Sequence, residues 1–566
     1  MGIKFTAGLW LASIVFGAWC AEISAAQISP QPAAADGSTP LHNAVYQDDF
    51  NQAKALLRAG ANAKAATRYG VTPLSLACTN GNAAMIELLL SAGADANEAL
   101  PGGETALMTA ARTGNADAVA ALLRHGANVN AKDGWRGQTA LMWAAAEGHA
   151  DAVKVLLDHG ADQHMRSQGA PARVNPATGV VITAVTTEDG APVASIKNAE
   201  VSPLVMQNKT PADAARATGG KAPESGKNAD ENKPAAGRGG GRASSGDFTP
   251  FLFAVRGGHI DVVKVLLAAG ADPNETLGDG TSALVLATTN ARYELGALLL
   301  DKGASANADK QGWTALHQVA WTRRPNIHKT PAAIPSGNMD SLTFVKVLVA
   351  HGANPNARET KEPRDGNLGK LRRIGATPYL LAAKSADTEL MRCLVVNGAD
   401  PTLMTAEKVS PLEAASGVGV YRVSESPGSN EDAMEAVLLA YELGSRDINW
   451  VDDNGNTAMH GAAMRGANTI VQFLFDKGAK LDVVNKIGWT PLTVAEGVFY
   501  PDVFKTEAQT EALLLKLGAK KRVVPEEVRY AGMDKDGRET TVGGGGDGAP
   551  AAKPKVDATK PPEGKN

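Results

Sequence analysis

The chain has 566 residues, of which 44% are hydrophobic, 20% are charged and only 5% are aromatic, while glycine occupies 60 positions. A compact protein of this length would divide into several domains, whereas a repeat array can continue as one quasi-linear unit. The formal net charge is −4, so the chain lacks the overall basic field with which proteins grip nucleic acid. We therefore expect no nucleic-acid partner.

The first residues have the pattern of a secretory signal peptide. Lys4 supplies the positive charge, and residues 5–19 form an apolar stretch that is short for a membrane span. Ser24-Ala25-Ala26 then offers small side chains for cleavage after Ala26. We expect residues 1–26 to be removed and the protein to be periplasmic or secreted. Cys20 leaves attachment of a lipid open, although a bulky residue precedes it.

A unit of about 33 residues recurs along most of the remaining chain. Thr39 can cap a first helix with its hydroxyl, and Pro40 fits the first helical turn, where its missing N–H costs nothing. An apolar second helix follows, and a glycine ends it. One unit cannot bury its own apolar face, so the units must stack. Eleven copies begin at Thr39, Thr72, Thr105, Thr139, Thr249, Ser282, Thr314, Thr377, Ser410, Thr457 and Thr490.

The best-preserved copies resemble the ankyrin-repeat family. They read Gly-Ser-Thr-Pro-Leu-His-Asn-Ala from Gly37 and Leu-Leu-Arg-Ala-Gly-Ala-Asn from Leu56, and Gly-Trp-Thr-Ala-Leu-His begins at Gly312. The resemblance runs from about Gly37 to Lys521 and is that of a bacterial, exported, multi-repeat member. It implies an all-α solenoid of about eleven helix-turn-helix units with β-hairpin fingers, together with disordered insertions and a disordered tail.

Breaks in the repeat define the predicted segments. The low-complexity composition of the longest insertion and of the tail is typical of disordered chain. The predicted organisation is a signal peptide at 1–26, repeats 1–4 at 27–164, a flexible insertion at 165–246, repeats 5–11 at 247–522 with insertions near 323–338, 359–373 and 417–430, and a disordered tail at 523–566.

The positions of the histidines and cysteines do not indicate a disulfide, a metal site or a catalytic site. Cys78 and Cys393 are six repeats apart, too far for a disulfide. Eight of the ten histidines recur at fixed repeat positions, which favours a role in the scaffold. No metal-ligand spacing is present, so we expect no metal, no cofactor and no catalytic residues.

Tryptophan and arginine are the better candidates, because these residue types dominate hot spots of protein interfaces. Some lie in an enlarged finger or on the concave side of a first helix, and others at the mouths of insertions. The residues alone leave a binding role and a structural role equally open. The candidates for partner binding are Trp135, Arg136, Trp143, Trp321, Arg323, Arg324, Tyr421 and Arg422.

The predicted function is that of an exported scaffold, which holds an unknown protein partner along its concave face and finger tips. The resemblance to ankyrin-repeat proteins implies this mode of binding. We expect a monomer without an integral membrane span. The alternatives are an effector directed to a host cell and an enzyme with its site in the inserted loops.

Overall fold

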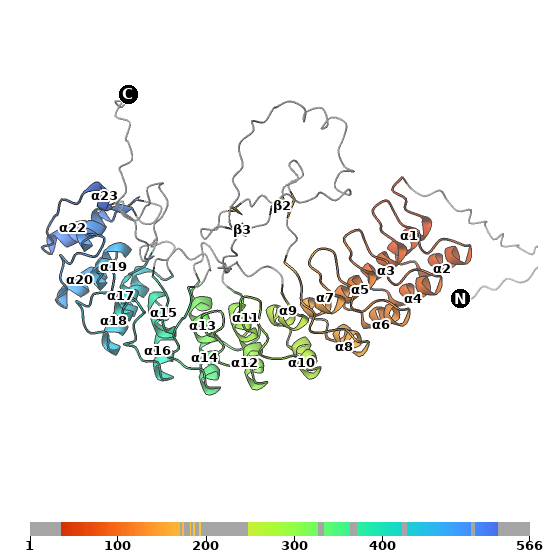
Figure 1. The fold of residues 1–566 in the computed structure, drawn as a ribbon, viewed down its shortest axis with the longest axis horizontal. Coiled ribbons are helices and arrows are strands. Elements are labelled where there is room, and N and C mark those ends of the chain that lie inside the picture. The colour runs from red at the N-terminus through yellow and green to blue at the C-terminus, as the bar shows by residue number, and fades with distance from the viewer. Residues whose placement is uncertain are drawn as a thin grey trace, which may run out of the picture.

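The computed structural model describes residues 35–169, 247–325, 333–362, 371–420, 427–499 and 504–529, together with four short strands between 173 and 193. The described chain forms a curved array of helix pairs that runs from one end of the molecule to the other (Figure 1). The first helix of each pair lies on the inner side of the arc and the second on the outer side. The predicted signal peptide, most of the 165–246 insertion and nearly all of the predicted tail lie outside the described residues.

Eleven helix pairs follow the eleven repeats of the sequence, and a short helix comes after them. The pairs are α1 Pro40–Tyr46 with α2 Phe50–Arg58, α3 Pro73–Asn80 with α4 Ala83–Ser91, α5 Ala106–Thr113 with α6 Ala116–Arg124, α7 Ala140–Glu147 with α8 Ala150–Asp158, α9 Pro250–Gly257 with α10 Ile260–Ala268, α11 Ala283–Thr289 with α12 Tyr293–Asp301, α13 Ala315–Arg323 with α14 Ser341–Ala350, α15 Pro378–Lys384 with α16 Thr388–Val396, α17 Pro411–Ser416 with α18 Asn430–Leu443, α19 Ala458–Arg465 with α20 Asn468–Asp476, and α21 Pro491–Glu496 with α22 Ala508–Lys516; α23 is Glu526–Arg529.

The caps confirm why the first helices begin where the sequence predicts. The Thr39 hydroxyl accepts a hydrogen bond from the His42 backbone N–H, while the His42 ring Nδ1 accepts one from the Thr39 N–H at 3.1 Å. Nε2 of the same ring lies 3.1 Å from the carbonyl oxygen of Val71 in the next unit. His317 and His460 make the same contacts, with the carbonyls of Ala376 and Trp489. These three histidines therefore cap a helix and join neighbouring units.

Small residues let the first helices approach one another. Their contact positions are fully buried alanines, among them Ala44, Ala77, Ala110, Ala144 and Ala254. The stack continues across the longest insertion, because α7 packs directly against α9. Across this junction Nε2 of His259 lies 2.8 Å from the carbonyl oxygen of Ala146. The described units therefore share one continuous apolar core.

The fingers are short turns closed by backbone hydrogen bonds. In one of them the Leu100 N–H donates to Glu104 O at 2.9 Å and the Gly103 N–H donates to Leu100 O at 2.7 Å, and isolated β-bridges occur at Ala99–Thr105 and Thr276–Ser282. Several fingers also bond to a neighbour, as the Gly134 N–H does to the Gly102 carbonyl at 2.9 Å. The two-residue strands pair as antiparallel ribbons elsewhere: β1 Arg173–Val174 with β2 Val181–Ile182, β3 Val185–Thr186 with β4 Pro192–Val193, and β5 Val498–Phe499 with β6 Phe504–Lys505.

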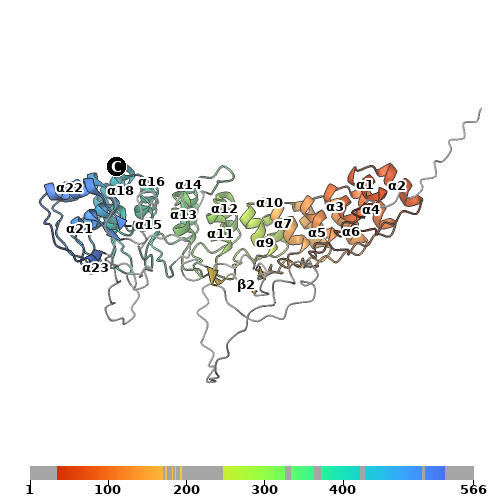
Figure 2. The same ribbon diagram turned by 90° about the horizontal axis from the view of Figure 1, so that it is seen from above.

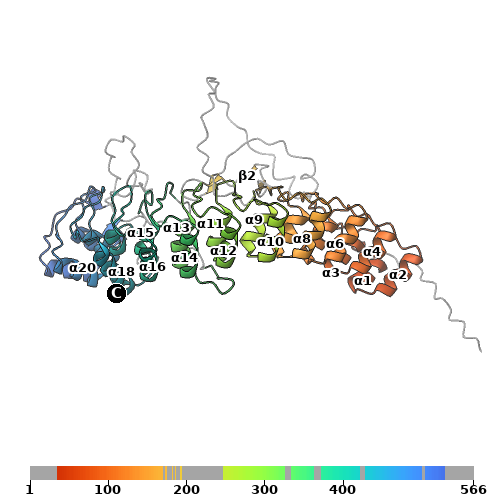
Figure 3. The ribbon, with the colours of Figure 1, turned by 90° about the horizontal axis from the view of Figure 1, so that it is seen from below.

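The fingers project to one side of the array (Figures 2 and 3). The two ends of the 165–246 insertion are pinned together at Ser167. The Ser167 N–H donates to the Phe248 carbonyl at 2.9 Å, and the Asp247 N–H donates to the Ser167 carbonyl at 2.6 Å. The insertion therefore leaves and rejoins the array at one point, and the fourth and fifth units stack as if it were absent.

Candidate partner-binding surface

The fourth and seventh residues of each first helix share a face, because they are three positions apart. Trp143 is the fourth residue of α7, and Arg112 is the seventh residue of α5. The Arg112 guanidinium lies 5.4 Å from the centre of the Trp143 ring, and one of its nitrogens lies 3.8 Å from a Glu104 carboxylate oxygen. Trp143 is half-buried, so this pair presents an aromatic edge and a cation together.

The next first helix repeats the arrangement with different residues. Phe253 is the fourth residue of α9, and Arg256 is the seventh. The Arg256 guanidinium lies 5.1 Å from the Phe253 ring and 4.7 Å from the ring of Phe248, which precedes the helix. Burial of part of this side chain and the nearby charge of Arg136 both lower the pKa of Arg256. Backbone hydrogen bonds bring Arg136 near the same place, since its carbonyl accepts the Gln168 N–H at 2.5 Å and the adjacent Ser167 donates its N–H to the Phe248 carbonyl at 2.9 Å.

Trp135 is the most exposed residue of this group. Its side chain keeps 67% of its surface accessible, and its ring lies against Gly102 of the preceding finger. Asp133 holds the turn, since one of its carboxylate oxygens accepts the N–H groups of Trp135 and Arg136. We call the whole group the cationic–aromatic surface: Arg112, Trp135, Arg136, Trp143, Phe253 and Arg256.

In the seventh unit the aromatic residue is half-buried Trp321, which contacts another aromatic ring and a cation of the chain. The Trp321 ring packs 5.3 Å from that of Trp313, and the Arg373 guanidinium lies 4.3 Å from the Trp321 ring centre. Arg373 ends the second predicted insertion and is 5% exposed. The chain itself therefore supplies the cation that packs on the Trp321 ring.

The two arginines after Trp321 are engaged inside the array. Arg323 forms a two-pronged ion pair with Asp387, at 2.7 and 3.1 Å, and a further bond to Glu389 at 2.9 Å. Arg324 lies 3.4 Å from the Asp432 carboxylate of the ninth unit. The structure thus places Arg323 and Arg324 in contacts between units, and neither joins the cationic–aromatic surface.

Tyr421 and Arg422 lie outside the described residues. The segment just before them, residues 417–420, crosses the inner side of α19 at Gly461. A side chain at Gly461 would lie 2.5 Å from the Val418 nitrogen, so only glycine permits this crossing. Gly461 is the fourth residue of its helix, the position that Trp143 and Phe253 hold in their own helices. Inserted chain therefore occupies the inner side of these later units.

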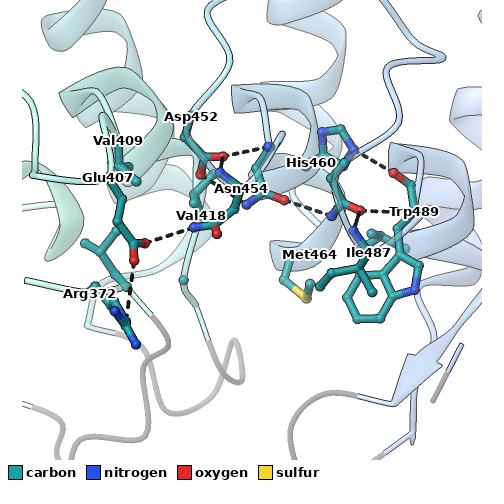
Figure 4. Close-up of a pocket in the computed structure, with 17 residues that line it drawn as sticks. Arg372, Glu407, Val409, Val418, Asp452, Asn454, His460, Met464, Ile487 and Trp489 are labelled. Atoms are coloured by element: carbon teal, nitrogen blue, oxygen red, sulfur yellow. Dashed lines mark hydrogen bonds and ion pairs between the residues drawn. The ribbon is translucent and has the colours of Figure 1, made fainter. Parts of the chain in front are cut away.

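Beside this crossing lies a groove of about 680 Å³, partly open to solvent, between the last fingers and α19 and α21 (Figure 4). Its walls combine apolar Met464, Ile487 and Trp489 with a polar network. Glu407 accepts a hydrogen bond from Asn454 at 2.9 Å and lies 3.4 Å from Arg372. These bonds run from finger to finger, so the polar groups stiffen the fingers.

Three ionisable groups near this groove have shifted pKa values. Burial lowers the pKa of His460 to about 4, and burial raises the pKa of Asp452. Burial also raises the pKa of Glu413 well above its usual range, and the nearby Asp452 adds to the effect. Glu413 holds the third position of α17, where His42 and His460 stand in other units, and its carboxylate accepts the Ser410 N–H at 2.7 Å.

Comparison with known families settles the identity of the fold. The family described as "Ankyrin repeats (3 copies)" matches residues 19–100, 94–167 and 251–359, and "Ankyrin repeats (many copies)" matches 439–495. The chain belongs to the ankyrin-repeat family. Ankyrin repeats generally mediate protein–protein interaction.

Several curated proteins are similar to this ankyrin-repeat protein. Human "Ankyrin repeat and SOCS box protein 16" is 36% identical over 249 residues, which are 44% of this chain and 47% of that protein. Human "Transient receptor potential cation channel subfamily A member 1" is 25% identical over 44% of this chain and 19% of its own length. The chicken "Nuclear factor NF-kappa-B p105 subunit" is 31% identical over 31% of this chain and 16% of its own length. The aligned part spans less than half of each of these relatives.

Sequence reasoning missed Arg112, Phe253 and Arg256 in this ankyrin-repeat protein. The signal was present, because an aromatic residue at the fourth helical position and an arginine at the seventh recur in register. Within the described residues, no group of three or more His, Cys, Asp or Glu side chains could hold a metal ion. No helix in the described part of the chain has the length and apolar character needed to cross a bilayer.

Proposed function

We propose that this ankyrin-repeat protein is a scaffold that binds a partner protein at the cationic–aromatic surface. Exposed Trp135, with 67% of its surface accessible, carries the proposal, because tryptophan is enriched in the hot spots of protein interfaces. Arg112, Arg136 and Arg256 add arginine, another residue type that dominates hot spots. Inserted chain crosses the inner side at Gly461 in the tenth unit, whereas Arg112 and Arg256 are exposed in the third and fifth units.

The role we propose is non-catalytic. The buried histidines are engaged in capping and in bonds between units, as His317 is with Thr314 and Ala376. Arg323 and Asp387 likewise hold two units together. These side chains, which could otherwise supply acid–base chemistry, thus serve the scaffold.

We also propose that the protein is exported as a monomer, with cleavage after Ala26. The apolar stretch and small residues of the first 26 positions support this. N-terminal sequencing of the protein recovered from a periplasmic or culture fraction should begin at Gln27. Recovery of the full-length chain from the cytoplasm alone would contradict export.

The binding proposal is tested by capture of partners with immobilised protein. We expect the Trp135→Ala, Trp143→Ala double variant to lose a partner that the parent protein retains, because two aromatic contacts are gone. Tyr69→Ala removes another exposed finger aromatic, 60% accessible, and serves as the matched control. Retention of every partner by the double variant would contradict the proposal.

A further inference from the structure

The cationic–aromatic surface carries more positive charge than its surroundings balance. Arg112 has Glu104 at 3.8 Å, but neither Arg136 nor Arg256 has a carboxylate at ion-pair distance among the residues that the structure describes. The net charge of the whole chain is −4, so this cluster of cations is local.

Two aromatic rings fix the position of the Arg256 guanidinium. The Arg256 guanidinium packs on Phe248 and Phe253, whose ring centres are 5.0 Å apart. Stacking on a ring leaves the edge of a guanidinium, with its N–H groups, free to bind a planar carboxylate in a two-pronged geometry. Arg136 provides a second such edge from the neighbouring finger, because its carbonyl accepts the Gln168 N–H at 2.5 Å, next to Ser167, whose N–H donates to the Phe248 carbonyl at 2.9 Å.

Two neighbouring like charges are unfavourable until an anion binds to both, and among the described residues no carboxylate lies at ion-pair distance from either guanidinium. The lowered pKa of Arg256, caused by burial and by Arg136, agrees with that geometry. Trp135 and Trp143 add apolar contact area from the fourth unit and the finger before it. An anion alone would not use these rings, whereas a polypeptide with acidic and apolar side chains would use both.

We propose that the cationic–aromatic surface binds an acidic, extended polypeptide segment, whose carboxylates pair with Arg136 and Arg256 while its apolar side chains pack on Trp135 and Trp143. This inference rests on the proposed function and narrows it to one class of partner. Charge complementarity selects the acidic segment, and an extended one can follow the row of contacting first helices from Arg112 on α5 to Arg256 on α9.

The test uses the full chain and a fluorescently labelled peptide of alternating Glu-Glu-Leu triplets, with binding measured by anisotropy at low and high salt. We expect binding that weakens with salt and falls at least about tenfold in the Arg136→Gln, Arg256→Gln double variant. The control is the Arg58→Gln, Arg392→Gln double variant, which removes the same charge from the outer helices α2 and α16. This control should bind like the parent protein.

Equal loss of binding in both double variants, or no loss in either, would overturn the proposal. Equal or tighter binding of single-stranded DNA of the same charge would also overturn it, because the surface would then select charge alone. If the peptide does not bind while the Trp135→Ala, Trp143→Ala variant still loses a captured partner, the acidic-segment proposal falls and the proposed function stands. If both results are negative, both proposals fall.

Discussion

Arg323 and Asp387 form a two-pronged ion pair that joins the end of α13 to the start of α16, with N···O distances of 2.7 and 3.1 Å. Asp387 is fully buried, and it also caps α16 by accepting the Leu390 N–H at 3.1 Å. The pair therefore holds the seventh and eighth units in register across a junction that carries inserted chain.

Loss of Arg323 should leave a buried carboxylate without its partner. We expect Arg323→Ala to lower the free energy of unfolding by about 3 kcal/mol, measured by urea denaturation. Arg124→Ala, which breaks an exposed pair with Glu87, is the control and should cost less than about 1 kcal/mol. Similar costs for the two variants would contradict the role assigned to Arg323.

Glu413 should make the fold less stable as pH rises. Its folded pKa is raised, so the folded state holds the proton more tightly than the unfolded state does. Stability is lost as pH climbs above the unfolded value of about 4.3. We expect Glu413→Gln, which keeps a hydrogen-bonding amide, to be more stable than the parent by at least about 1 kcal/mol at pH 7.5 but not at pH 4. The same difference at both pH values would exclude a titration effect.

His317 and His460 should have the opposite dependence. Burial lowers both pKa values to about 4, below the unfolded value of 6.5. Their contribution is present above pH 6.5 and is lost as pH falls toward 4. Between pH 6.5 and pH 4, we expect the free energy of unfolding to fall by up to about 3 kcal/mol less in His460→Gln than in the parent protein. An equally steep fall in His460→Gln and in the parent protein would count against burial of His460 as the cause.

Gly461→Ala should dislodge the inserted chain from α19. The added methyl would lie 2.5 Å from the Val418 nitrogen, and the segment cannot move without exposing buried Val418 and Val420. We expect a loss of roughly 1–3 kcal/mol and faster hydrogen exchange at residues 418–420. Unchanged exchange there would show that the crossing adapts without cost.

The regular part of the molecule could be predicted well from the sequence, because each unit folds through the same local interactions. Thr39, Thr72 and Thr105 each cap a first helix, and capping needs only the local residues. The contacts of the insertions could not be predicted in this way. Arg373 meets Trp321, and Leu371 meets Gly419, from segments that have no repeat counterpart to fix their position.

The same distinction separates the candidate residues. Trp135, Arg136 and Trp143 lie within the regular units, where Trp135 is exposed and the Trp143 ring lies near Arg112. Trp321, Arg323 and Arg324 lie beside an insertion, where tertiary contacts decide what remains exposed. Sequence periodicity identifies which face of a helix is inward, but it does not show what the rest of the chain lays over that face.

Site-specific photo-crosslinking tests the central claim most directly. A photoreactive amino acid at Ala146, the seventh residue of α7, faces the cationic–aromatic surface, and one at Lys154 on α8 faces outward. We predict a protein adduct from position 146 that Trp135→Ala, Trp143→Ala abolishes, and none from position 154. Equal adduct yields at the two positions, or an adduct that survives the double substitution, would contradict binding at this surface.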